Sequence, residues 1–246
     1  MFKSSNPVLS KMEEMPKGFV GSGAMTVNGT IAKTFFLLLI AAIAGGAVFY
    51  EALMGYTDKV STIIMITLIG GAITGIITSF VPKLAKFLSP IYAFCEGALL
   101  TGLSLMLEIQ FPGIAIQAIS GTLLCLGVML FLYSIGAIRA TEKVRAFLMS
   151  AMITIVILYG INIIGMFFNF SIPFITGNGP MGLLFSSIVV AVAAFSLILD
   201  FDFIEKGQAQ MLPKDFEWYG AFGLLVTLVW LYIEILKLIS KLRSND

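Results

Sequence analysis

Three long stretches of this chain contain no charged residue, and they limit its possible folds more than any other feature. They run from Ser61 to Val81, from Ile114 to Ile138 and from Phe147 to Phe168. An α-helix needs roughly 20 predominantly apolar residues to cross the hydrocarbon core of a bilayer. Each stretch reaches that length, so the sequence predicts a membrane protein with several helical spans.

Further apolar segments with few charges complete the pattern. Hydrophobic residues make up 59% of the chain and charged residues 12%, whereas soluble domains have about 45–50% and about 25%. We predict an all-α membrane protein with seven transmembrane helices. The predicted spans are Thr34–Leu53, Ser61–Val81, Ile91–Leu107, Ile114–Ile138, Phe147–Phe168, Met181–Ile204 and Trp218–Ile239.

The connections between these spans are short and contain the turn residues Gly, Pro and Asn, as in Gly177–Pro180. They leave no room for a soluble domain. We therefore expect a polar N-terminal leader at residues 1–30 and one seven-helix membrane domain at residues 31–246. The leader lacks an early apolar stretch, so we expect no cleaved signal peptide.

The basic residues predict how the bundle crosses the membrane. Positive side chains collect in cytoplasmic loops, and most of the 15 Lys and Arg residues fall on one side if the N-terminus is inside. The exceptions are Lys59 and the C-terminal group Lys237, Lys241 and Arg243. We therefore predict an N-in, C-out orientation.

Several function classes are disfavoured by composition. The net charge of +1 gives no reason to expect a nucleic-acid partner, and the absence of histidine removes His-based triads and most zinc and haem sites. Cys95 and Cys125 fall inside predicted spans, where cysteine behaves as a small apolar residue. We expect no enzymatic activity, no catalytic residue and no cofactor.

Charged residues inside the predicted spans are the candidate functional groups. A charged side chain at mid-bilayer costs roughly 2.5–3.5 kcal/mol on insertion scales, so such residues are usually retained for a function. The candidates are Glu51, Glu96, Asp200, Asp202, Glu234 and Lys237.

Helical geometry separates the two aspartates of the sixth span. At about 100° per residue, Asp200 and Asp202 point some 200° apart. Asp200 shares an arc of about 80° with the small and polar residues of its span. We therefore expect Asp200 to face the protein interior and Asp202 to be a solvated charge at the inner interface. The small and polar residues of this stripe are Gly182, Ser186, Ala193 and Ser196.

Two further arrangements remain open from the sequence. Glu234 and Lys237 lie three residues apart on one helix face and could pair with each other, or Glu234 could be the outer member of a polar path through the bundle. Glu96 and Asp200 lie at comparable depth, which permits two carboxylates that share a proton or transiently hold a divalent cation such as calcium.

Several segments, taken together, resemble the Bax inhibitor-1 family, in a bacterial branch. These are YAFCEGALLTGLSL in the third span, LILDFDFIEKG at the end of the sixth, the polar-striped last helix, and a leader SSNPVLSKMEE followed by MTVNGTIAKTFFLLLIA. The resemblance covers nearly the whole chain. It implies a last helix that lies centrally among the other six, and a location in the bacterial cytoplasmic membrane.

The resemblance also implies a pH-modulated leak channel or exchanger for calcium or other cations, with calcium as the transported ion. In the family, an aspartate late in the sixth span pairs with one in the seventh. The first corresponds to Asp200, but Thr227 occupies the second position. Either Thr227 hydrogen-bonds Asp200, or another acid such as Glu96 is its partner.

The alternative function is a non-conducting regulator that binds other membrane proteins. In both cases the lipid bilayer is the expected surrounding, and the oligomeric state is left open.

Overall fold

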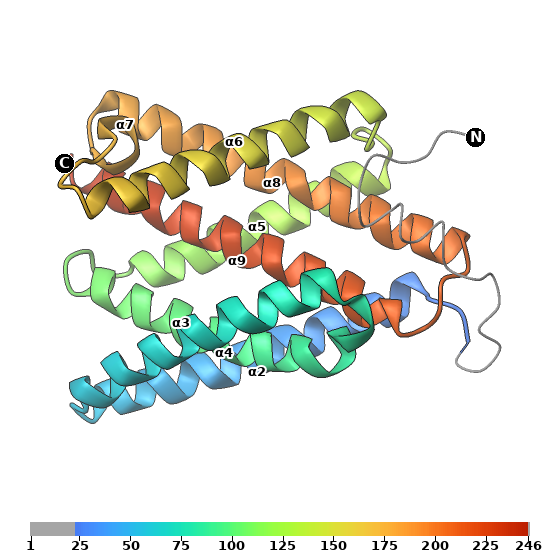
Figure 1. The fold of residues 1–246 in the computed structure, drawn as a ribbon, viewed down its shortest axis with the longest axis horizontal. Coiled ribbons are helices and arrows are strands. Elements are labelled where there is room, and N and C mark those ends of the chain that lie inside the picture. Colours follow the sequence, from blue (N-terminus) through green and yellow to red (C-terminus); the bar gives the residue numbers. More distant parts are fainter. Residues whose placement is uncertain (1–22, 246) are drawn as a thin grey trace.

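The computed structural model of this protein describes residues 23–245 and consists almost entirely of helices (Figure 1). Seven of them are long and apolar enough to cross a membrane, which confirms the predicted all-α, seven-helix fold. The direction in which they cross stays a prediction. The long helices are α2 (Val27–Leu53), α3 (Thr57–Phe80), α4 (Ala85–Glu108), α5 (Ile114–Ser134), α6 (Glu142–Met166), α8 (Pro180–Ala209) and α9 (Phe216–Arg243). The short ones are η1 (Pro82–Leu84) and α7 (Pro173–Thr176).

The predicted leader falls largely outside the described residues, which begin at Gly23. Helix α2 starts at Val27, before the end assigned to the leader at residue 30. The Thr26 side chain accepts a hydrogen bond from the Gly29 N–H at 2.9 Å, which caps the first turn of α2. This capping explains why the helix extends beyond the apolar stretch on which the predicted span was based.

The starts of two other helices follow from local sequence in the same way. The Thr141 side chain accepts a hydrogen bond from the Val144 N–H at 3.3 Å and caps α6. Pro180 occupies the first position of α8, where its missing N–H is not needed and its fixed φ suits a helix.

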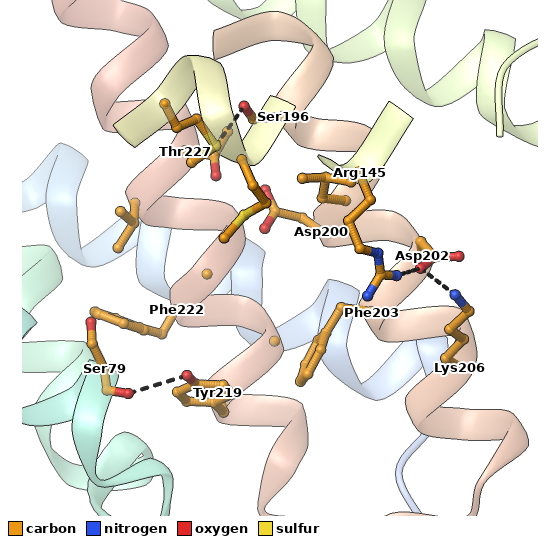
Figure 2. A pocket seen from close by; sticks show the side chains of 16 residues that line it. Ser79, Arg145, Ser196, Asp200, Asp202, Phe203, Lys206, Tyr219, Phe222 and Thr227 are labelled. Carbon is orange, nitrogen blue, oxygen red and sulfur yellow. Dashed lines mark hydrogen bonds and ion pairs between the residues drawn. The ribbon is translucent and has the colours of Figure 1, made fainter. Parts of the chain in front are cut away.

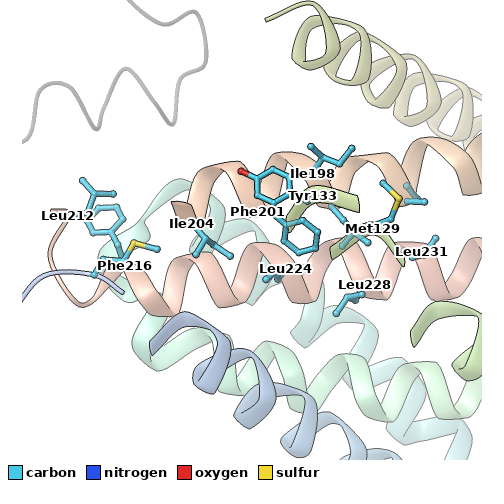
Figure 3. Packing of buried hydrophobic residues seen from close by; sticks show 14 residues of the cluster. Met129, Tyr133, Ile198, Phe201, Ile204, Leu212, Phe216, Leu224, Leu228 and Leu231 are labelled. Carbon is cyan, nitrogen blue, oxygen red and sulfur yellow. The ribbon is translucent and has the colours of Figure 1, made fainter. Parts of the chain in front are cut away.

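Helix α9 lies at the centre of the bundle, between α2, α4, α5 and α8 (Figure 1), as the resemblance implied. Its buried residues come from all sides of the helix, whereas the outer helices expose large apolar residues such as Phe35 and Leu124. The largest apolar cluster joins α8 and α9 to α5 through Leu197, Leu231 and Met129 (Figure 3). The exposed apolar surface of the outer helices is what a lipid environment requires.

Helices α2 and α4 pack at very short distance because of one glycine. A side chain on Gly97 of α4 would overlap the backbone of Ala41 in α2. Small residues at such crossings allow backbones to approach closely, which is a principal source of helix association in membranes. Gly97 therefore fixes the α2–α4 side of the bundle.

Candidate functional site

A cavity of about 290 Å³ lies against the central helix at the end of the bundle where α3 ends and α6 begins. We refer to it as cavity 1. Its walls come from α3, α6, α8 and α9, and its polar side chains are drawn in Figure 2. The polar and charged residues that line it are Ser79, Arg145, Ser196, Asp200, Asp202, Lys206, Tyr219 and Thr227.

Asp200 occupies the position in α8 that the sequence predicted. The small residues of its stripe are buried, with Ala193 and Ser196 exposed by 0% and 2%, so this face of α8 does point into the protein. The Asp200 carboxylate faces α9, where a side chain on Gly223 would lie 3.6 Å from its Oδ1. Its Oδ2 is buried and has no hydrogen-bond partner within residues 23–245.

Thr227 of α9 lines the same cavity as Asp200. Its side chain is 8% exposed. Of the two partners left open by the sequence, Thr227 is the one that lines the same cavity as Asp200, whereas Glu96 lines another. A hydroxyl can donate a hydrogen bond to a carboxylate but brings no opposite charge.

The prediction that Asp202 is a solvated charge is wrong. Asp202 is 8% exposed, and its Oδ2 accepts a hydrogen bond of 2.6 Å from Arg145 of α6. The same oxygen lies 2.8 Å from the Nζ of Lys206, one turn along α8. Asp202 lines cavity 1 together with Asp200, and helix α6 supplies the positive charge of Arg145 that makes its burial tolerable.

Glu96 lies in a different part of the bundle from Asp200. It lines a second cavity of about 200 Å³ between α2, α4, α5 and α9, which we call cavity 2. One of its carboxylate oxygens abuts α3, where a side chain on Gly71 would lie 3.0 Å from it. The central helix α9 separates the two cavities, so the structure does not bring Glu96 and Asp200 together, and the sharing of a proton or cation that comparable depth permitted has no geometric basis in this arrangement.

Glu234 forms a buried polar cluster towards the opposite end of α9. It is 1% exposed, its Oε1 accepts a hydrogen bond of 3.0 Å from Lys237, and its Oε2 accepts one of 2.9 Å from the Tyr159 hydroxyl of α6. The pairing of Glu234 with Lys237 that the spacing allowed is thus present. Tyr159 links the pair to α6.

Glu51, the remaining candidate, is the least buried of the acids. Its carboxylate lies 3.5 Å from Lys59, and the two side chains are 32% and 60% exposed. An ion pair this exposed contributes little to stability.

One further buried acid is not among the candidates predicted from the sequence. Glu217, at the start of α9, is 1% exposed, and its Oε1 accepts hydrogen bonds from the N–H and the hydroxyl of Thr26, at 3.0 and 2.9 Å. Its Oε2 pairs with Lys33 of α2. Its position just before the predicted seventh span gave no signal, because the partners are more than 180 residues away.

These five carboxylates of the bundle therefore fall into two kinds. Asp202, Glu217 and Glu234 are buried and each pairs with at least one basic side chain. Asp200 and Glu96 have no such partner in the part of the chain that the structure describes. Unpaired carboxylates in a bilayer are costly. A contribution to stability therefore does not explain why Asp200 and Glu96 are buried.

An apolar layer separates Asp200 from Glu234. On each of three helices, an apolar residue lies between the cavity and the far polar cluster: Ile155 in α6, Val189 and Val192 in α8, and Trp230 in α9, all packed together. From Thr227 to Glu234 the rise along α9 is about 10 Å.

Within the described residues, no group of three or more His, Cys, Asp or Glu side chains gathers as a metal site.

These features define a polytopic membrane protein in which unpaired carboxylates line cavities beside a central helix. The chain belongs to the Bax inhibitor 1 like family, whose sequence model matches residues 6–244. No curated protein and no solved structure matches the chain.

Proposed function

We propose that this protein is a pH-modulated cation leak channel or exchanger in which Asp200 binds the transported ion, with calcium as the best candidate. The supporting observation is the Asp200 carboxylate, which lines cavity 1. Among residues 23–245, one of its oxygens is buried without a hydrogen-bond partner and no basic side chain pairs with it. Carboxylate and hydroxyl oxygens are the ligands that hard cations such as calcium prefer. Asp200 and Thr227 together offer both.

In this proposal the ion enters cavity 1 and reaches Asp200, while the apolar layer of Ile155, Val189, Val192 and Trp230 closes the route to Glu234. Hydrophobic constrictions stop ion flow because they exclude water. Opening then requires α6 to move away from α8 and α9. The main packing of α6 is against α8, so such a movement disturbs few other interfaces.

Protonation of Asp200 supplies the pH dependence. A proton and a cation compete for the same carboxylate, and a protonated Asp200 no longer carries the charge that attracts the cation. Glu96 has no place on this route because it lines cavity 2. The proposal contains no catalytic step and no cofactor, and it keeps the bacterial cytoplasmic membrane as the location.

The test is calcium flux into proteoliposomes of purified protein, measured from about pH 6 to about pH 8. We expect wild-type flux to change with pH, and Asp200→Asn to have low flux without a pH response. Glu96→Gln is the matched control, because it removes the other unpaired carboxylate, and it should keep the wild-type pH response. If the calcium flux of wild-type protein is no greater than that of protein-free liposomes, the proposal is refuted and the non-conducting regulator is favoured.

A further inference from the structure

Two basic side chains that line cavity 1 share one carboxylate. Arg145 and Lys206 approach the same oxygen of Asp202, at 2.6 and 2.8 Å, so one carboxylate faces two cations. Neither cation pairs with another acid among residues 23–245. Both basic side chains therefore keep N–H donors free for a second acceptor.

Arg145 also has donors that the protein does not use. A guanidinium carries five N–H groups, and within the described residues Arg145 forms one hydrogen bond, to Asp202. Its Nε is buried without a partner, which costs free energy until an acceptor is supplied. The planar guanidinium fits phosphate oxygens especially well.

Cavity 1 opens sideways, towards the region of the bilayer. Helices α3 and α6 lie on either side of α9 (Figure 1) and both line the cavity, through Ser79 and Arg145. Between them the central helix is uncovered, since Val226 of α9 is 36% exposed. A lipid can therefore reach the cavity between α3 and α6 without entering from the aqueous side.

The order of the side chains along α6 matches a lipid. Arg145 lies three residues inside the start of α6, about 5 Å along the helix, close to the end of a candidate membrane span. Met149 and Met152 line the cavity about 6 and about 10 Å deeper. The volume of about 290 Å³ is at the lower end of the usual range for ligand pockets, which suits part of a lipid whose remainder stays in the bilayer.

We propose that the mouth of cavity 1 binds the phosphate of an anionic phospholipid. Arg145 and Lys206 hold the phosphate, Asp202 keeps the two cations in place, and the first acyl segment lies along Met149 and Met152. Basic pockets between transmembrane helices at a membrane surface bind anionic headgroups in this way. The inference does not depend on ion transport, because lipid binding is measured without flux.

Native mass spectrometry of the full chain in detergent tests the site, with phosphatidylglycerol, phosphatidylcholine or inorganic phosphate as the added probe. We expect phosphatidylglycerol to bind more tightly than phosphatidylcholine, and inorganic phosphate not to displace it at equal concentration. Arg145→Gln and Lys206→Gln should each weaken phosphatidylglycerol binding by about fivefold. The side chain of Lys206 is 44% exposed, so its replacement leaves folding intact even if Arg145→Gln does not.

The control is Arg139→Gln, which removes an exposed positive charge near the start of α6 and should leave lipid binding unchanged. Equal loss in Arg139→Gln and Lys206→Gln would overturn the proposal, because it would indicate attraction by overall charge. Equal binding of the two lipids, or displacement by inorganic phosphate, would also overturn it.

Discussion

Glu217→Gln is expected to loosen the junction between α2 and α9, which the buried Glu217 carboxylate holds together. The glutamine keeps an oxygen that can accept from Thr26, but its NH2 group faces the ammonium of Lys33 and the ion pair is lost. Breaking a fully buried pair costs about 3–5 kcal/mol. Because the side chain of Lys33 is 18% exposed and one acceptor remains, we expect a smaller loss of about 2–3 kcal/mol.

Amide hydrogen exchange measures this loss locally. The Thr26 N–H donates directly to Glu217, and the Gly29 N–H donates to the Thr26 side chain, so both amides report on the junction. A loss of about 2–3 kcal/mol corresponds to roughly 30- to 150-fold faster exchange of these amides.

The matched control is Glu51→Gln, which removes the same charge from an exposed pair with Lys59. That change should cost less than about 0.5 kcal/mol and leave exchange near Thr26 unaffected. If exchange near Thr26 rises less than about threefold in Glu217→Gln, the junction does not depend on this carboxylate and the reasoning is refuted.

Three further changes are expected to act at other points of the bundle. Tyr159→Phe removes the donor to Glu234 and should cost about 1 kcal/mol, seen as faster amide exchange in α6; unchanged exchange would contradict it. Gly97→Val forces a side chain into the backbone of α2 and should lower the midpoint of thermal unfolding. Gly46→Ala, which meets no atom within 4 Å, should not. Trp230→Ala removes part of the apolar layer and should raise calcium flux; flux equal to wild type would show that this layer is not the barrier.

The sequence predicted the features that depend on one helix at a time. The length of the stretches without charged residues identified the spans. The period of 3.6 residues per helical turn placed Asp200 on the inward face of α8. Spacing along a single helix also allowed the pairing of Glu234 with Lys237. In each case the information lies within a few turns of the chain.

Features that depend on which helices are neighbours could not be predicted in this way. Asp202 was expected in solvent because its wheel position says nothing about α6, which brings Arg145 from 57 residues away. The sequence placed Glu96 and Asp200 at a comparable depth along the bundle, but depth does not say on which side of the bundle a residue lies. The central helix lies between their cavities. The partners of Glu217 are equally remote in sequence.

The most direct test of the central claim is the calcium flux of Asp200→Asn relative to wild type, in proteoliposomes with equal amounts of reconstituted protein. Asparagine preserves the size of the side chain and removes its charge, so the packing against Gly223 and Thr227 is retained. We expect wild-type protein to conduct calcium above the liposome background and Asp200→Asn to lower this flux by about tenfold or more. Equal flux through the two proteins would contradict the assignment of Asp200 as the ion-binding group.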